Sequence, residues 1–402
     1  MTAVSDLRLL ARLRGLHRSL VESADTDIGY PNATDLDVFP LLRFWDTPLN
    51  NVGHPFAASR GFRGHTLQIE RDVVSEVADL LRGPADDITG YVTNGGTEGV
   101  RYGLLQARER FGRVVLYASS AAHTCVAKLA RELRIQLVVV PADARDELDY
   151  DALVAVAAGR PRRAAVAVVA TIGTTMAEAI DDVRRVHAAL DAAGVPAGRR
   201  YVHADAALTG LALAGLDPAA RPGFDLGDGA DSISVSGHKF LGVPTPCGVV
   251  VARASRGVPA EPTRTYTGAP DMTLTGSRSG HTPLMIWWAL RTFGRDGLRR
   301  RAAASRHMAA RAVDLLTQAE VPAWKHPLAC TVVLPRPSDT FLNTWPIAVH
   351  GDWAHIICMP GKDEETVRRF IGAYLADVRP TSDRQLRATT PLAVAEESVL
   401  AC

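Results

Sequence analysis

The sequence predicts an α/β fold built on a mostly parallel sheet with helices on both faces. Three observations lead to this prediction. The 402 residues, 47% of them hydrophobic, are enough for one large domain with a smaller one appended, or for two comparable domains. Between residues 88 and 252, short apolar runs alternate with amphipathic stretches. Polar residues and glycines directly follow several of these runs, where folds of this class bind ligands.

The expected strands are continuous apolar runs, as in a parallel sheet that is buried on both faces. They cover residues 113–117, 136–140, 164–170, 200–203, 231–235 and 248–252. Helix-like stretches lie between most of them, over residues 98–111, 123–133, 149–158 and 181–193. The expected order of elements is therefore repeated strand and helix, with crossovers between parallel neighbours.

The rest of the chain is expected to cover and extend this sheet. Residues 1–60 are interpreted as an N-terminal arm and covering segment, 61–283 as the large domain and 284–402 as a small C-terminal α+β domain. Residues before 88 look loop-rich, and about 255–275 lose periodicity, which predicts a mobile functional loop. The small domain should open with a helix over 284–316, interrupted near 294–297. It should continue with strands over 330–334 and 354–358 and a helix over 364–375.

The N-terminal stretch from Leu7 to Leu20 mixes leucines with arginines. Acidic residues bracket it, and no apolar core or cleavage site follows, so a targeting peptide is disfavoured. We expect an amphipathic helix that docks on the body of the protein or on a partner subunit.

Charge and cysteine content exclude several classes of function. Lys and Arg number 45 against 44 Asp and Glu, so no electrostatic footprint for nucleic acid or for an anionic membrane surface is present. No apolar run approaches the length of a membrane span. The five cysteines are widely spaced, which predicts neither a disulfide framework nor a metal site. A cytoplasmic location fits best.

Lysine is rare, because only Lys128, Lys239, Lys325 and Lys362 occur among the 45 basic residues. Lys239 stands in Ser236-Gly237-His238-Lys239, after an expected strand and close to glycines. A lysine in this setting can form a Schiff base, which arginine cannot. A surface lysine in a turn is the alternative.

Other polar residues follow the remaining strands in order. Thr93 to Gly99 is a glycine turn before a helix, where free amides favour an anion. His123 follows the next strand, Thr171 to Thr175 another, and Asp205 the run ending at His203. A carboxylate there can hold a pyridinium nitrogen protonated. Each feature alone is equally typical of a turn or a helix cap, but their joint order favours one site.

With these segments the sequence resembles the pyridoxal-phosphate-dependent group II amino-acid decarboxylases of fold type I, most of all the bacterial histidine and plant serine decarboxylases. The resemblance implies a seven-stranded sheet in the large domain, pyridoxal 5'-phosphate as cofactor and a small amino acid as substrate. It also implies a homodimer with its active site at the subunit interface. The matching segments are 90–99, 172–175, 179–182, 203–208, 231–248, 276–278 and 281–284.

The resemblance also implies a role for each residue around the cofactor ring. Lys239 would form the covalent link, Asp205 would pair with the ring nitrogen, and His123 and Ala207 would contact opposite ring faces. Thr171 would lie near the cofactor. The residues expected at the phosphate are Gly96, Thr97, Ser236, His238 and, from the other subunit, Ser277.

On the substrate side the resemblance points to Asn51, to His54 and to Tyr266, which we expect to protonate Cα after CO₂ leaves. His54 stands where the family usually has Asp, and Val100, Ser279 and the segment 359–362 also depart from its pattern. Decarboxylation is therefore better supported than histidine as the substrate.

Three classes of function remain to be compared. An L-amino-acid α-decarboxylase is favoured, with histidine first and valine, leucine, methionine or serine as alternatives. An aminotransferase or decarboxylating oxidase is the second class, but nothing marks Arg368, Arg369 or Arg379 as a carboxylate clamp. An inactive scaffold is disfavoured, because Lys239 and Asp205 are both present.

Overall fold

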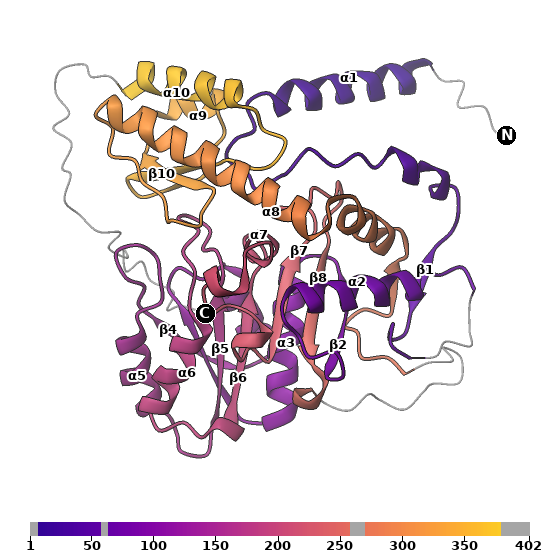
Figure 1. Cartoon of the computed structure of the whole chain (residues 1–402), viewed down its shortest axis with the longest axis vertical. Coiled ribbons are helices and arrows are strands. Elements are labelled where there is room, and N and C mark those ends of the chain that lie inside the picture. The colour runs from indigo at the N-terminus through magenta and orange to yellow at the C-terminus, as the bar shows by residue number, and fades with distance from the viewer. Residues whose placement is uncertain (1–6, 58–62, 258–269, 379–402) are drawn as a thin grey trace.

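The structure is a computed structural model that describes residues 7–57, 63–257 and 270–378. Its central sheet has seven strands in the order β2-β8-β7-β6-β5-β3-β4 (Figure 1). Only β8 runs against the others, so the mostly parallel α/β sheet is confirmed. The strands are β2 (Ile88–Thr93), β3 (Val114–Ser119), β4 (Gln136–Val140), β5 (Ala165–Thr171), β6 (Arg200–Asp205), β7 (Ser232–Ser236) and β8 (Gly248–Arg253).

Helices cover both faces of this sheet. The residues of β5 alternate between two core clusters, because successive side chains of a strand point to opposite faces. One cluster joins β5 to α3 and α4, and the other joins it to the remaining helices of this part of the chain. The helices are α2 (Leu67–Leu80), α3 (Gly96–Phe111), α4 (Cys125–Glu132), α5 (Tyr150–Ala158), α6 (Val183–Ala192) and α7 (Gly210–Ala214).

A long helix, α8 (His281–Gln318), leads to the C-terminal part of the chain (Figure 1). It bends at Gly294, whose φ of 57° and ψ of −179° interrupt the helix near the predicted position. Beyond it lie β10 (Thr331–Pro335), α9 (Asp339–Thr344), β11 (Val349–His350), β12 (Trp353–Ile357) and α10 (Glu364–Val378). These elements enclose a core cluster of their own. The predicted domain boundaries remain predictions.

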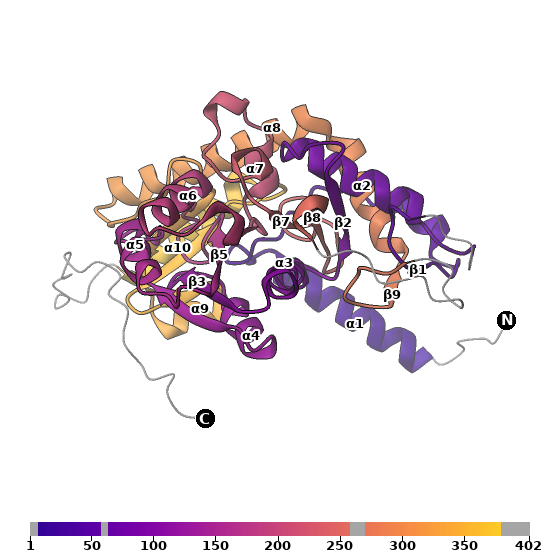
Figure 2. The same ribbon diagram turned by 90° about the horizontal axis from the view of Figure 1, so that it is seen from below.

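The N-terminal helix α1 (Leu7–Ala24) is present, but its leucine face is not covered by the body of this chain. Figures 1 and 2 show α1 along the outside of the molecule. Leu13 is 60% exposed and Leu20 61% exposed. Among the described residues, no helix is both long and apolar enough to cross a membrane.

Several elements were missing from the sequence prediction, and two of them adjoin the main sheet. The region before residue 88 holds the helix α2, and β2 adds an outer strand. In α2 the buried positions include Leu67, Glu70, Val74 and Val77. Because a fully buried carboxylate occupies a core position, the apolar periodicity that would have indicated the helix is broken.

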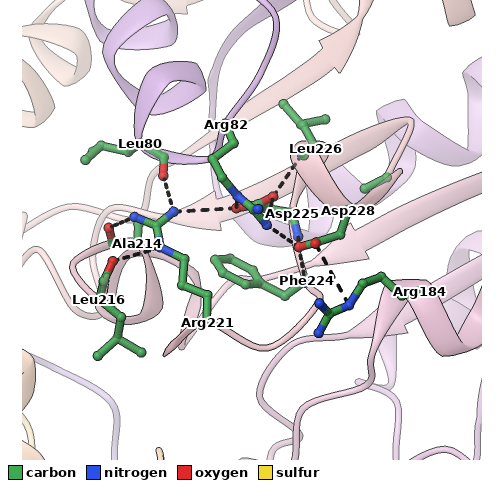
Figure 3. A network of polar contacts seen from close by, with 12 residues as sticks. Leu80, Arg82, Arg184, Ala214, Leu216, Arg221, Phe224, Asp225, Leu226 and Asp228 are labelled. Carbon is green, nitrogen blue, oxygen red and sulfur yellow. Dashed lines mark hydrogen bonds and ion pairs between the residues drawn. The ribbon is translucent and has the colours of Figure 1, made fainter. Parts of the chain in front are cut away.

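A buried polar network joins the end of α2 to the segment between α7 and β7 (Figure 3). The Arg221 guanidinium donates to the carbonyl oxygens of Leu80 at 3.0 Å and Leu216 at 2.9 Å. Asp225, which is 0% exposed, forms an ion pair with Arg82 at 2.8 Å. The network satisfies backbone carbonyls that would otherwise be buried without donors.

Candidate active site

The carboxyl ends of several strands meet at one edge of the main sheet. β5 ends at Thr171 and β6 at Asp205, and these two residues are paired across the strands. β7 ends next to them at Ser236. A cavity of about 500 Å³ opens beside these ends. Parallel sheets bind ligands at this edge, because the loops that leave it can surround a small molecule.

The cavity brings together nine of the ten residues predicted to bind the cofactor: Gly96, Thr97, His123, Thr171, Asp205, Ala207, Ser236, His238 and Lys239. The tenth, Ser277, lies exposed on β9 (Ser277–Ser279), where its hydroxyl oxygen accepts a hydrogen bond from Asn50 Nδ2 at 3.2 Å. Thr275 of the same chain lines the cavity instead.

At one end of the cavity the start of α3 offers backbone amides to an anion. No side chain caps this helix, and its N-cap Gly95 has a φ of 147°. A Cβ atom at Gly96 would lie 2.9 Å from Ala207 Cβ and 3.2 Å from Ser236 Oγ. The carboxylate of Glu98 stabilises the turn before α3, because it accepts a hydrogen bond from the backbone N–H of Asn94 at 2.9 Å. Such a cradle fits a phosphate group.

Asp205 lies deeper in the cavity and is 6% exposed. Within the described part of the chain, its carboxylate accepts one hydrogen bond, from Ala207 N at 3.3 Å. Burial raises the pKa of Asp205, and the positive charge of Lys239 opposes this shift. Thr171 Oγ1 is also buried here and has no partner among the described residues. A protonated ring nitrogen would supply the donor that this carboxylate lacks.

Lys239 follows β7 and reaches the same cavity. Burial lowers the pKa of its amine below the ordinary value, and the carboxylate of Asp205 acts in the opposite direction. A lowered pKa increases the share of neutral amine that can react with a carbonyl group. The anion cradle, the buried carboxylate and this amine therefore fit pyridoxal phosphate.

The segment around His123 differs from the prediction in one detail. The helix was expected to begin at His123, but α4 begins at Cys125. The reason is that His123 Nδ1 accepts the backbone N–H of Cys125 at 3.2 Å and so takes the place of a helix cap. Cys125 also lines the cavity, and burial raises the pKa of its thiol to about 11.

Several cavity residues were not singled out from the sequence. Cys125, Leu129 and Glu132 lie on one face of α4, at the spacing of successive helical turns. That periodicity, counted onward from Cys125, was the signal that could have found Leu129 and Glu132. Arg101, which also lines the cavity, forms an ion pair with Glu132 at 2.5 Å.

The predicted substrate residues Asn51 and His54 do not line the cavity of this chain. Asn51, on β1 (Asn50–Val52), donates to Glu70 Oε2 at 2.6 Å, and Arg278 forms a buried ion pair with Glu70 at 3.0 Å. His54 Nε2 lies 2.9 Å from Thr89 Oγ1. Burial lowers the pKa of His54 to about 4.

Other expectations from the sequence have simple outcomes. Tyr266 and most of the predicted mobile loop lie outside the described residues. Val100 and Met359, two of the positions that depart from the family pattern, are both 0% exposed and belong to the protein core. Neither lines the cavity.

Comparison with known proteins agrees with this geometry. The pyridoxal-dependent decarboxylase conserved domain matches residues 65–323. A histidine decarboxylase of Mesorhizobium japonicum is 41% identical over 360 residues, which cover 90% of this chain and 96% of the relative. A histidine decarboxylase of Morganella morganii is also 41% identical, over 87% of this chain and 92% of the relative.

Among solved structures, the fold is similar to that of L-methionine decarboxylase from Streptomyces sp. 590 in its internal aldimine form. The TM-score is 0.84 at 25% identity, over 93% of this chain and 95% of the other. Glutamate decarboxylase from Lactobacillus brevis has a TM-score of 0.77 at 18% identity, over 94% and 93% of the two chains.

Proposed function

This chain belongs to the pyridoxal-dependent decarboxylase family, and we propose that it converts L-histidine to histamine and CO₂. It is an amino-acid decarboxylase that uses pyridoxal 5'-phosphate. One observation supports histidine as the substrate: identity to curated histidine decarboxylases reaches 41% over about the whole length of both chains. The similarity to the methionine enzyme is lower in sequence, at 25%.

We propose the following division of labour in the cavity. Bound pyridoxal phosphate supplies an electron-withdrawing ring next to the substrate Cα. Lys239 Nζ would carry the covalent link, and Asp205 would keep the ring nitrogen protonated. His123 and Ala207 would orient the ring from opposite faces. The anion cradle at the start of α3 would fix the phosphate, so that the carboxylate to be lost is presented in one orientation.

We further propose that Tyr266 protonates Cα once CO₂ has left. Tyr266→Phe should then slow amine formation and raise the share of aldehyde by-product, while the affinity for the cofactor stays unchanged. Equal loss of cofactor affinity and activity would assign Tyr266 to binding instead.

A homodimer in the cytoplasm is the proposed working form. The exposed apolar face of α1 supports an interface between two copies, since patches of this kind on a monomer usually mark contact surfaces. In the dimer Ser277 of one copy would reach the phosphate site of the other. The described cysteines are all buried and free, as suits a reducing compartment.

The substrate is tested by comparing kcat/KM for histidine, methionine, leucine, valine and serine under saturating cofactor. We expect histidine to exceed every other amino acid by at least about a hundredfold, the discrimination that a site with dedicated polar contacts achieves. Preference for methionine or an aliphatic amino acid would leave the decarboxylase in place and overturn histidine as its substrate.

An aminotransferase is disfavoured because Arg368, a candidate clamp for the substrate carboxylate, pairs with Glu364 on the exposed face of α10.

A further inference from the structure

One buried carboxylate has no part in the site described so far. Glu178 lies between β5 and α6, is 1% exposed, and has a φ of +56°, in the left-handed region that residues other than glycine rarely adopt. Holding a charged residue in this conformation is costly, so the surrounding contacts must determine it.

Those contacts come first from the segment 171–175, part of which lines the cofactor cavity, and from Thr209, which packs against that segment. Glu178 Oε1 accepts a hydrogen bond from Thr209 Oγ1 at 3.1 Å. Thr209 is packed against Gly173, where a Cβ atom would lie only 2.2 Å from its hydroxyl oxygen. The Glu178 amide donates to Thr174 O at 2.9 Å. Gly173 and its neighbours Thr171 and Thr175 line the cavity.

The other oxygen of the same carboxylate holds the start of β10. Glu178 Oε2 accepts from the backbone amides of Cys330 at 2.9 Å and Thr331 at 2.8 Å, and from Thr331 Oγ1 at 2.7 Å. Cys330 Sγ also donates to Glu178 Oε2 at 3.3 Å, and no ion pair to this carboxylate is present among the described residues. Hydrogen bonds to a buried charge are strong, and removing the acceptor would leave several buried donors unpaired.

We propose that Glu178 is a positioning residue that fastens the segment 171–175 of the cavity wall, directly and through Thr209, to the first residues of β10. The shape of the cofactor cavity then depends on the C-terminal sheet, although no strand of that sheet lines the cavity. In support, the negative charge of Glu178 acts on Lys239 and opposes the lowering of its pKa by burial. The inference rests on the cofactor site, not on the identity of the substrate.

The test compares Glu178→Gly with Glu320→Gly. Glu320 has a φ of +61° but is exposed at the end of α8, so glycine relaxes the backbone in both variants and removes a buried acceptor in only one. Two readouts apply: the Kd of the apo-protein for pyridoxal phosphate, and amide hydrogen exchange in peptides that cover residues 171–175, 209 and 330–331.

For Glu178→Gly we expect the Kd to rise by about tenfold or more, the loss typical of a hydrogen bond to a charged group. Exchange should increase in all three segments, and Glu320→Gly should change neither readout. Faster exchange at 330–331 alone, with an unchanged Kd and protected cavity segments, would overturn the proposal. If the wild-type protein itself failed to bind the cofactor, the proposed function would fail instead.

Thr331→Val provides a second test should Glu178→Gly not fold. It removes one donor on the side remote from the cavity and keeps the carboxylate. A Kd raised by a few fold, together with faster exchange at residues 171–175, is expected. An unchanged Kd and unchanged exchange at 171–175 would contradict the coupling.

Discussion

Lys239 is the residue on which the proposed chemistry depends most directly. Lys239→Ala should lower amine formation by about a thousandfold or more, because Lys239 is the one lysine among the described residues that line the cavity. Borohydride should attach the cofactor permanently to the wild-type protein but not to this variant, and the intact mass of each protein measures the difference. Lys128→Ala, at an exposed position of α4, is the control and should retain both properties.

His54 is expected to make stability depend on pH. Its pKa is about 4 in the folded protein, below the ordinary value of 6.5, so the unfolded chain binds more protons between these values. The stability that neutral His54 contributes is fully present above about pH 6.5. It is lost as the pH falls from there through about 4, and the free energy of unfolding should decrease by about 3 kcal/mol in total over this range.

Urea unfolding of wild-type protein and His54→Gln between pH 4 and 7.5 measures this contribution. The variant should show a smaller loss of unfolding free energy on acidification than the wild type. His307→Gln, at an exposed position of α8, should follow the wild-type curve. Identical curves for His54→Gln and wild type would exclude His54 as a source of the pH dependence.

Among individual residues, those that follow the ends of strands could be predicted from the sequence, whereas buried charged residues away from the strand ends could not. Lys239, Asp205 and Thr97 were found because the ends of parallel strands share one edge. Glu70 and Glu178 were not found, because their donors come from segments distant along the chain, and only the fold brings such segments together.

The helix α3 sets the position of the anion cradle, because glycines let it approach the sheet closely. A Cβ atom at Gly99 would lie 2.4 Å from Ser234 Cβ, and one at Gly103 would lie 2.4 Å from His203 Nδ1. His203 is fully buried between Ser232 and Ser234 on the same face as Asp205. Beneath α3, polar side chains of β6 and β7 therefore lie beside the apolar cluster that α3 shares with β5.

Gly99→Ala should displace α3 from the sheet and lower the unfolding free energy by about 1 to 3 kcal/mol, the usual effect of overpacking. Cofactor affinity should fall with it, since the start of α3 moves. Gly372→Ala, in α10, has nothing within 4 Å of the added Cβ and should instead stabilise by up to about 1 kcal/mol. Thermal unfolding and cofactor titration of both variants provide the check, and equal behaviour would contradict the close-approach argument.

Whole elements were predictable where apolar runs are continuous. The run at 136–140 became β4 with the same bounds, and Gly294 did interrupt α8. The short pair of β1 and β9 was not predictable, because residues 50–52 meet residues 277–279 only after the chain has folded around the sheet.

At the scale of the whole molecule, the exposed face of α1 predicts the oligomeric state. Replacing Leu13 and Leu16 with Glu places two charges on this face, and we expect sedimentation to shift from dimer toward monomer, with loss of activity if Ser277 acts across the interface. Ala11→Glu with Arg18→Glu, on the side of the same helix that faces away from these two leucines, should leave the dimer intact. A wild-type monomer would contradict the proposed assembly.

The sequence predicted the α/β architecture and the family, but not how copies of the chain associate. A resemblance carries over motifs within one chain, whereas an interface depends on surface shape. Leu9, Leu13, Leu16 and Leu20 of α1 are each at least 50% exposed in this chain. The same limit applies to the side chain that the substrate pocket accepts.

Product analysis of histidine turnover in D₂O tests the central claim most directly. The account predicts one CO₂ and one histamine for each histidine consumed, with a single deuterium at Cα, because solvent-exchangeable acid replaces the lost carboxylate. An oxo acid formed without CO₂ would show an aminotransferase, and an aldehyde formed with oxygen consumption would show an oxidase. Either result would contradict the proposed reaction.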